Sequence, residues 1–184
     1  ENTKGKKMLE LGCGNGWLVN RLSEIENSVV QGMDVNISEL KQAARIFGAK
    51  ENVLFLCGDI FEIDAKQPEH KFDYIILSAV LSYFENPARL INQLIGLLNP
   101  GGEVHILDSP FYNNTQAAKE RSQKYFESLG CSAMTQHYHH HSLEVLDEFK
   151  YAVLYDPDKT MNRLKRFIFG DRPPFYWIKI ADGE

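Results

Sequence analysis

The stretch KMLELGCGNG, residues 7–16, decides the fold of this chain. It begins with a short apolar run, residues 7–11, and apolar side chains at helical spacing follow it over residues 17–25. Between these two segments stand three glycines at alternate positions: Gly12, Gly14 and Gly16. Glycine lets the backbone turn sharply and approach a ligand without a Cβ in the way. The stretch therefore predicts a strand, a tight loop and a helix.

The alternation of strand and helix continues along the chain from this loop. Residues 72–77, FDYIIL, form an unbroken apolar run typical of a parallel strand that is covered on both faces. Asn86 and Pro87 are typical of an N-cap and a first helical residue, and the apolar stripe that follows extends to Leu98. Further strands are expected over residues 29–33, 53–57 and 103–107, and a further helix over 38–47. Such units build a doubly wound, mostly parallel α/β sheet.

The last third of the sequence is less regular. A turn over residues 99–102 precedes it. Helices are expected over residues 114–129, over 142–149 with Ser142 as the cap, and from 156 through 169. The final strands are expected over residues 151–155 and 175–180, the last of them antiparallel. The seven strands and their helices make one domain, residues 1–184, with residues 111–141 as an insertion over the carboxyl edge of the sheet.

The composition excludes several classes of protein. The 184 residues are 43% hydrophobic and 24% charged, as in an ordinary soluble domain with a core, and the net charge of -5 disfavours nucleic acid as a partner. Three cysteines without a CxxC pair give no disulfide framework and favour a reducing compartment: Cys13, Cys57 and Cys131. No apolar run has the length of a signal peptide or a membrane span, so we expect a cytoplasmic protein without a membrane partner. Because the chain begins without Met and soon enters a strand, we expect further residues upstream.

The residues that could bind a ligand or take part in a reaction follow the ends of predicted strands. In an open α/β sheet, ligands bind outside the carboxyl ends of the strands, near the switch point. The glycines follow the first strand, Asp34 ends the second and Asp59 ends the third. The Asp34 carboxylate suits a ribose diol, and Asp59 would lie within reach of an adenine amino group. The expected ligand is an adenosine derivative.

The spacing of the glycines distinguishes between adenosine derivatives. A dinucleotide fingerprint has the spacing GxGxxG, and its third small position is occupied here by Trp17. The segment ELGCGNG, residues 10–16, stands in its place. A nicotinamide-dependent oxidoreductase is therefore the least favoured of the alternatives.

Four landmarks occur in order: ELGCGNG, GMDVN, GDI and FDYIILSAVLSYFENPARLINQLIGLLNPGG. With them the chain resembles the class I S-adenosylmethionine-dependent methyltransferases, in particular the small-molecule, type 11-like group. The resemblance covers residues 7–108 and implies a Rossmann-like, cofactor-binding half there, with residues 111–141 near the substrate site and residues 142–184 as a C-terminal helix and strand pair. The residues that it places against the cofactor are Glu10, Gly12, Cys13, Gly14, Asn15, Gly16, Asp34, Val35, Asp59, Ile60 and Ser78.

The resemblance also implies a role for most of these residues. The loop of residues 12–16 would cradle the methionine part, and Glu10 would orient the loop or meet the amino group through water. Asp34 would hold the ribose and Val35 would pack on the adenine. The amide of Ile60 would read the adenine edge together with Asp59, whose plainer alternative is a turn or helix cap.

The implied reaction requires little acid–base chemistry. A sulfonium carries an activated methyl group, so the protein mainly aligns the acceptor and excludes water. Ser78 would lie beside the amino acid end of the cofactor, and Ser82 and Tyr83 would face the substrate. Tyr83 stands where the family often has His, so it is a candidate either for a base or for an aromatic wall.

A histidine run is the remaining unusual feature: His137, His139, His140 and His141. Neighbouring residues of an extended segment point to opposite faces, so these histidines do not readily converge on one metal ion. The preferred interpretation of the run is loop packing and capping near Ser142. A contact with substrate or a role as base comes second, and a metal site comes last. Four aromatic residues are candidates for core or for an acceptor pocket: Phe111, Tyr112, Tyr125 and Phe126.

Missing motifs narrow the acceptor. Methyltransferases of base amino groups resemble one another in a [DNS]PP[YF] motif after the fourth strand, where this chain has LSAV, residues 77–80. The chain also lacks a Pro-Cys dipeptide, which would supply the nucleophile for methylation of cytosine at C5. A small-molecule acceptor is therefore expected. The alternative from another class is a module that binds the cofactor without catalysis.

Overall fold

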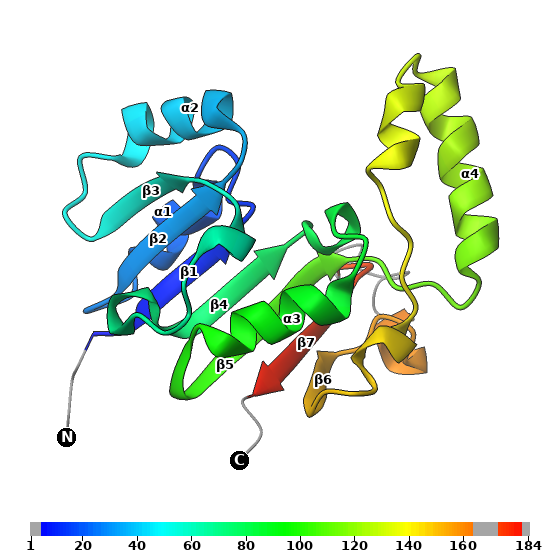
Figure 1. Ribbon diagram of the computed structural model, residues 1–184. Coiled ribbons are helices and arrows are strands. Elements are labelled where there is room, and N and C mark those ends of the chain that lie inside the picture. The colour runs from blue at the N-terminus through cyan, green and yellow to red at the C-terminus, as the bar shows by residue number, and fades with distance from the viewer. Residues whose placement is uncertain (1–4, 164–172, 182–184) are drawn as a thin grey trace.

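A single seven-stranded sheet organises the chain in the computed structural model, which describes residues 5–163 and 173–181. The strand order is β3-β2-β1-β4-β5-β7-β6 (Figure 1). The strands are β1 (Lys7–Leu11), β2 (Val29–Asp34), β3 (Val53–Cys57), β4 (Phe72–Ser78), β5 (Leu98–Ser109), β6 (Tyr151–Tyr155) and β7 (Tyr176–Ala181). The first five strands are parallel, and β7 is antiparallel to both of its neighbours. The predicted doubly wound sheet with an antiparallel C-terminal strand is confirmed.

The order of the strands reverses between β1 and β4. Leu11 at the end of β1 pairs with Leu77, one residue before the end of β4. The segments that leave these two strands therefore start side by side at the carboxyl edge, although 66 residues lie between Gly12 and Ala79 in the chain. This edge is where an open sheet of this kind takes its ligand.

The α-helices that lie wholly within the described residues are α1 (Trp17–Leu22), α2 (Ile37–Phe47), α3 (Pro87–Gly96) and α4 (Thr115–Ser128). The last three begin at an asparagine whose side chain accepts backbone N–H groups of the first turn: Asn36, Asn86 and Asn114. Such caps satisfy amides that have no partner within the helix. The N-cap predicted at Asn86 is confirmed.

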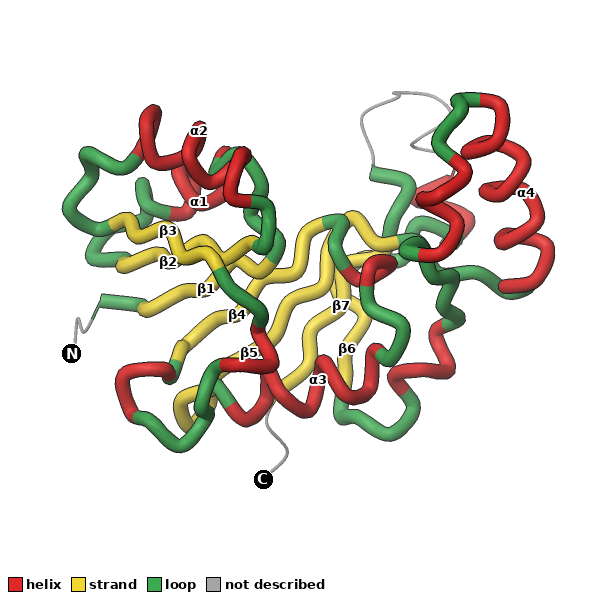
Figure 2. Tube along the Cα trace, turned by 45° about the horizontal axis from the view of Figure 1, so that its top comes forward, coloured by secondary structure: helices red, strands yellow, loops and turns green. Residues whose placement is uncertain are grey.

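The two faces of the sheet pack differently (Figure 2). On one face, Leu9 and Leu11 of β1 join the large core that contains the stripe of α3. On the other face, Met8 packs with Val19 of α1 and Leu40 of α2 in a smaller core. Successive residues of a strand point to opposite faces, so a single apolar strand supplies both cores.

Several element boundaries differ from the prediction. α1 ends at Leu22, and it buries Val19 rather than Trp17 or Ile25 of the predicted stripe. The predicted turn at residues 99–102 lies inside β5. Phe72 of β4 pairs with Leu98, and two residues later Tyr74 pairs with Glu103, so the register shifts across the turn. The chain therefore forms a bulge in a continuing strand rather than a break between elements.

Residues 142–149 contain less helix than predicted. The helix expected over residues 142–149 is one 3₁₀ turn, η5 (Leu143–Leu146), and the Ser142 side chain donates to the Glu144 carboxylate instead of capping it. Residues 160–163 are helical, and the rest of the helix expected through residue 169 lies outside the described residues. The smaller 3₁₀ elements are η1 (Ile60–Glu62), η2 (Pro68–His70), η3 (Leu81–Tyr83) and η4 (Ser132–Gln136).

The segment between β5 and β6 carries α4 and η4, which stand out beyond the sheet in Figure 1. The chain returns from them through residues 137–141, which run beside the segment that follows β5. There Phe111 forms a bridge with His141, and the Tyr112 amide donates to the His141 carbonyl oxygen at 2.8 Å. The insertion is thereby tied to the carboxyl end of the sheet.

Candidate functional site

A cavity of about 720 Å³ opens at the carboxyl ends of β1, β2, β3 and β4. Eight of the residues proposed from the sequence line it: Gly12, Gly14, Asp34, Val35, Asp59, Ile60, Ser78 and Tyr83. Its other lining residues are Leu11, Asn36, Glu39, Gly58, Phe61, Ala79, Val80 and Phe84. A cavity of this size suits a nucleoside-sized ligand.

The glycine loop closes one side of the cavity with backbone. The Gly12 and Cys13 amides both donate to the Met33 carbonyl oxygen, at 2.7 and 3.1 Å, which ties the loop to β2. Gly12 has a φ of +72°, and a Cβ there would lie 2.4 Å from a methyl group of Val80. Only glycine satisfies both conditions, so the loop brings bare backbone to the cavity.

Asp34 fixes the same loop from the end of β2. Its Oδ2 accepts the Gly14 amide at 2.8 Å, and its Oδ1 accepts the Asn36 amide at 2.8 Å. A carboxylate oxygen has a second lone pair, so each oxygen can still accept a hydroxyl from the cavity. Asp34 thus holds the loop and presents acceptors to a ligand at the same time.

Asp59 has the capping role that was its plainer alternative. Its Oδ1 accepts the Phe61 amide at 3.0 Å and caps the short helix η1. It also lies on the cavity wall, beside the buried Ile60. The cap leaves its other carboxylate oxygen available to a ligand.

Sequence reasoning missed two polar residues of this wall, Asn36 and Glu39. The Asn36 Oδ1 accepts the Ser38 backbone amide at 3.1 Å, and the Asn36 side-chain Nδ2 donates to Glu39 Oε1 at 3.2 Å. Glu39 Oε2 lies so close to Gly14 that a Cβ on that glycine would be only 2.6 Å from it. The N-x-x-E spacing of a capping box was a signal in the sequence for both residues.

Three predicted residues lie outside this cavity, around a neighbouring hollow of about 560 Å³: Glu10, Cys13 and Asn15. Ser78 lines both spaces, so the two adjoin at the end of β4. Gly16 lines neither, because it packs against Phe55 and Ala43. The predicted set is therefore divided between two adjoining spaces.

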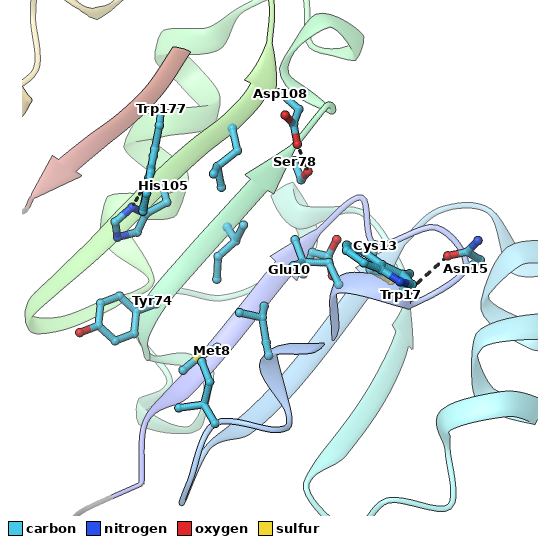
Figure 3. A pocket seen from close by; sticks show the side chains of 15 residues that line it. Met8, Glu10, Cys13, Asn15, Trp17, Tyr74, Ser78, His105, Asp108 and Trp177 are labelled. Carbon is cyan, nitrogen blue, oxygen red and sulfur yellow. Dashed lines mark hydrogen bonds between the residues drawn. The ribbon is translucent and has the colours of Figure 1, made fainter. Parts of the chain in front are cut away.

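Glu10 is the most unusual group of the hollow (Figure 3). Its side chain is 4% exposed, and its Oε2 has no hydrogen-bond partner among the described residues. The pKa of Glu10 is raised to about 8, mainly by burial, with a smaller contribution from the charge of Asp34 and an opposing one from a backbone hydrogen bond of Val19. Burial also raises the pKa of the neighbouring Cys13 thiol to about 12, so Cys13 does not serve as a nucleophile at neutral pH.

One wall of the hollow is a mostly apolar face of β1, β4, β5 and β7. Figure 3 shows Met8, Tyr74, His105 and Trp177 along it, to the left of Glu10, Cys13 and Asn15. The Trp177 indole donates to His105 Nδ1 at 3.0 Å, and His105 Nε2 lies 3.1 Å from Glu103 Oε2. Nδ1 accepts here, so the neutral imidazole carries its proton on Nε2.

The end of β4 is strained next to the cavity. Ala79 has a φ of +58° and Asp108, at the facing end of β5, has a φ of +51°. The Ser78 hydroxyl donates to Asp108 Oδ2 at 3.1 Å, and the Ala79 amide donates to the Leu107 carbonyl oxygen at 3.0 Å. Non-glycine residues in this conformation cluster at ligand sites.

Tyr83 joins the cavity to the insertion. It is 52% exposed, lines the cavity, and meets the ring of Tyr138 edge-on at 5.9 Å between centroids. Ser82, expected beside Tyr83 at the substrate, is buried and does not line the cavity; its carbonyl oxygen accepts the His139 amide at 2.7 Å. Among the described residues, no hydrogen bond is formed to the Tyr83 hydroxyl, and the ring packs edge-on against Tyr138.

The histidine run packs against the loop after β4. His141 is buried, and its Nε2 donates to the Phe84 carbonyl oxygen at 3.0 Å. Burial lowers the pKa values of His140 and His141. His140 Nε2 lies 2.8 Å from the Ser122 hydroxyl. Over residues 5–163 and 173–181, no three His, Cys, Asp or Glu side chains gather as a metal site requires.

The profile of a family described as a methyltransferase domain matches residues 2–153. Malonyl-[acyl-carrier protein] O-methyltransferase 2 of Ilyobacter polytropus is 32% identical over 118 residues, which are 64% of this chain and 44% of that protein. The ubiquinone biosynthesis O-methyltransferase of Coxiella burnetii is 32% identical over 102 residues, which are 55% and 42% of the two chains. The chain thus spans less than half the length of these relatives.

Solved structures agree in fold. The plantazolicin methyltransferase BpumL, in complex with a pentazolic desmethylPZN analog and SAH, superimposes with a TM-score of 0.65 at 15% identity, over 97% of this chain and 77% of that one. The CurJ carbon methyltransferase superimposes with a TM-score of 0.67 at 17% identity, over 100% and 50%. Within the described ranges, none of the helices combines the length and the apolar character that crossing a membrane requires.

Proposed function

The chain belongs to the family of methyltransferase domains, and from this premise we propose that it transfers a methyl group from S-adenosylmethionine to a small-molecule acceptor. The cofactor of this family is S-adenosylmethionine. The observation that carries the proposal is the pairing of a bare glycine loop with Asp34 at the wall of one cavity.

The residues present fit this cofactor. A Cβ on Gly12 would enter the space of Val80, so that backbone is kept open for a close ligand. Asp34 and Asp59 each retain acceptor capacity, as a ribose diol and an adenine amino group require. Val35 lies on the same wall and is 74% exposed. An apolar side chain so exposed at a cavity is available to pack on the adenine ring.

The methionine end would lie where the cavity meets the hollow, beside Ser78 and Glu10. Glu10 combines burial with an Oε2 that has no partner in the part of the chain that the structure describes. A buried carboxyl oxygen without a partner is costly, and a cationic amino group would relieve this cost. We assign Glu10, directly or through water, to the amino group.

When bound, the cofactor supplies an activated methyl group. The chain's own contribution is to align the acceptor with that group and to exclude water. Tyr83 suits this role as a wall between the cavity and the insertion. Acceptors that are already nucleophilic at neutral pH fit this site, because no side chain of residues 5–163 or 173–181 forms a hydrogen bond with the Tyr83 hydroxyl.

Calorimetric titration with S-adenosylhomocysteine tests the cofactor part of the proposal. We expect saturable, one-to-one binding and no comparable binding of NAD. Transfer of label from methyl-labelled S-adenosylmethionine to a low-molecular-weight extract tests catalysis. Binding without any transfer would leave a cofactor-binding module, and preference for NAD would overturn the proposal.

A further inference from the structure

The segment that follows β4, residues 79–84, forms one wall of the cavity and is called the wall segment below. Four of its residues line the cavity: Ala79, Val80, Tyr83 and Phe84. Near one end, a methyl group of Val80 lies so close to Gly12 that a Cβ there would be only 2.4 Å away. At the other end, the Phe84 ring meets the ring of Phe61, which also lines the cavity, edge-on at 6.1 Å between centroids. The position of the wall segment therefore affects the space between the glycine loop and η1.

The return segment, residues 137–141, holds the wall segment from outside the cavity. The His139 amide donates to the Ser82 carbonyl oxygen at 2.7 Å, and His141 Nε2 donates to the Phe84 carbonyl oxygen at 3.0 Å. The first is a backbone bond, which any residue other than proline forms at that position. The second depends on the imidazole. His141 thus contributes a bond to the wall segment that is specific to its side chain.

His141 is itself fixed from the other side. Its backbone forms a bridge with Phe111, and its carbonyl oxygen accepts the Tyr112 amide at 2.8 Å. The side chain is 7% exposed, so water competes poorly for the bond to Phe84. Burial lowers the pKa of the His141 ring, so the imidazole is neutral at pH 7 and carries its proton on Nε2. The ring therefore links the two segments that follow the neighbouring strands β4 and β5.

The structure places His141 behind the wall segment rather than in the cavity. His141 does not line the cavity, whereas Tyr83 and Phe84 do. Within residues 5–163 and 173–181 it also joins no group of three side chains suited to a metal ion. An effect of His141 on a ligand in the cavity therefore acts through the wall segment.

We propose that His141 is a positioning residue for the cofactor cavity, whose Nε2–H holds the Phe84 carbonyl oxygen and thereby keeps the wall segment in place against the cofactor. A wall that is fixed before the ligand arrives avoids the cost of ordering it on binding. Because His141 belongs to the insertion, residues 111–141, the bond also ties the insertion to the cavity. This inference rests on the proposed function and goes beyond it, since it gives the insertion a part in cofactor binding.

Calorimetric titration of three variants with S-adenosylhomocysteine tests the inference. His141→Leu keeps an apolar side chain but removes the donor, and we expect it to weaken binding at least about fivefold, as the loss of one hydrogen bond of average strength would. His141→Gln places an amide N–H close to the position of Nε2 and should restore most of the affinity. His140→Leu is the matched control and should bind like the unaltered protein, because His140 Nε2 lies 2.8 Å from the Ser122 hydroxyl of α4 and does not bond with the wall segment.

Hydrogen exchange of the free protein separates this role from a general loss of stability. Within the wall segment, the Tyr83 amide donates to the Val80 carbonyl oxygen at 3.0 Å, and the Phe84 amide donates to that of Leu81 at 3.1 Å. His141→Leu should speed exchange of these two amides, and His141→Gln should slow it again. The amides of β1 serve as the reference, and equal acceleration there would contradict a local role. If His141→Leu does not fold, His141→Asn takes its place in both measurements, since its amide is one methylene group short of the position of Nε2.

The two proposals fail in different ways. If S-adenosylhomocysteine does not bind the unaltered protein, the proposed function fails and this inference falls with it. If it binds the unaltered protein and His141→Leu equally well, only the role of His141 fails and the methyltransferase stands. An equal loss of affinity in His140→Leu, or a loss that His141→Gln does not restore, would also show that the bond to Phe84 is not the cause.

Discussion

The Gly14 amide donates to Asp34 Oδ2 at 2.8 Å, so the loop after β1 is held by the carboxylate that ends β2. The two residues are 20 positions apart in the sequence, and parallel pairing of their strands brings them together. Removal of the carboxylate therefore affects both the loop and the ligand that lies against it.

Asp34→Ala should weaken binding of S-adenosylhomocysteine by ~2–3 kcal/mol, because hydrogen bonds to charged groups contribute ~1.5–3 kcal/mol. Calorimetric titration measures the change. Asp64→Ala is the matched control, since Asp64 also accepts an amide two residues ahead, from Lys66 at 2.9 Å, but does not line the cavity. Unchanged affinity in Asp34→Ala would remove Asp34 from the cofactor site.

Gly12→Ala should destabilise the protein more than Gly101→Ala. Both glycines have a similar φ, +72° and +75°, so both variants carry the strain of a left-handed alanine, ~1–2 kcal/mol. A Cβ at Gly101 meets nothing within 4 Å, whereas at Gly12 it meets Val80, which adds ~1–3 kcal/mol of overpacking. Urea unfolding measures the difference, and equal losses would contradict the close approach of Val80.

Glu10 should make the protein less stable as the pH rises. Its pKa is about 8 in the folded protein against a reference value of 4.5, so between these values the folded state binds more protons than the unfolded state. The free energy of unfolding then falls by up to about 1.4 kcal/mol per pH unit in that window and levels off above pH 8.

The variant Glu10→Gln provides the measurement for this effect. Urea unfolding between pH 5 and 8 gives the free energy of unfolding of both proteins. Because both contain the same histidines, the contribution of those residues drops out of the difference between the two free energies. We expect Glu10→Gln to gain stability over the unaltered protein as the pH rises. A difference that does not change with pH would mean that Glu10 is ionised in the folded state.

Ala79→Gly should stabilise the protein by ~0.5–1 kcal/mol. Ala79 has a φ of +58°, which costs an alanine ~1–2 kcal/mol, and the greater freedom of glycine in the unfolded chain offsets part of the gain. Ala88→Gly in α3 should have the opposite sign, with a loss of ~1 kcal/mol. Thermal unfolding compares the two, and a loss in Ala79→Gly would exclude strain at this position.

Local patterns predicted most of the elements because their signals are short-range. The apolar run of β4 and the Asn86–Pro87 start of α3 depend on neighbouring residues, and they were confirmed. The end of α1 and the helix predicted at Ser142 were wrong for a common reason. A helix end depends on what the rest of the molecule packs against it, as the burial of Val19 instead of Trp17 shows.

The sequence by itself determined the doubly wound α/β class, because the alternation of strands and helices is a short-range pattern, and it predicted a site at the carboxyl edge of the sheet from the glycines and acids at the strand ends. Only the tertiary structure distinguished the environments of Glu10 and Asp34. Glu10 is buried with an Oε2 that has no partner among the described residues, whereas the Asp34 carboxylate accepts two backbone amides. The tertiary structure also placed Tyr138 between Tyr83, which lines the cavity, and Phe126 of α4. These relations depend on which residues meet across long separations in the chain, and a one-dimensional pattern does not contain that information.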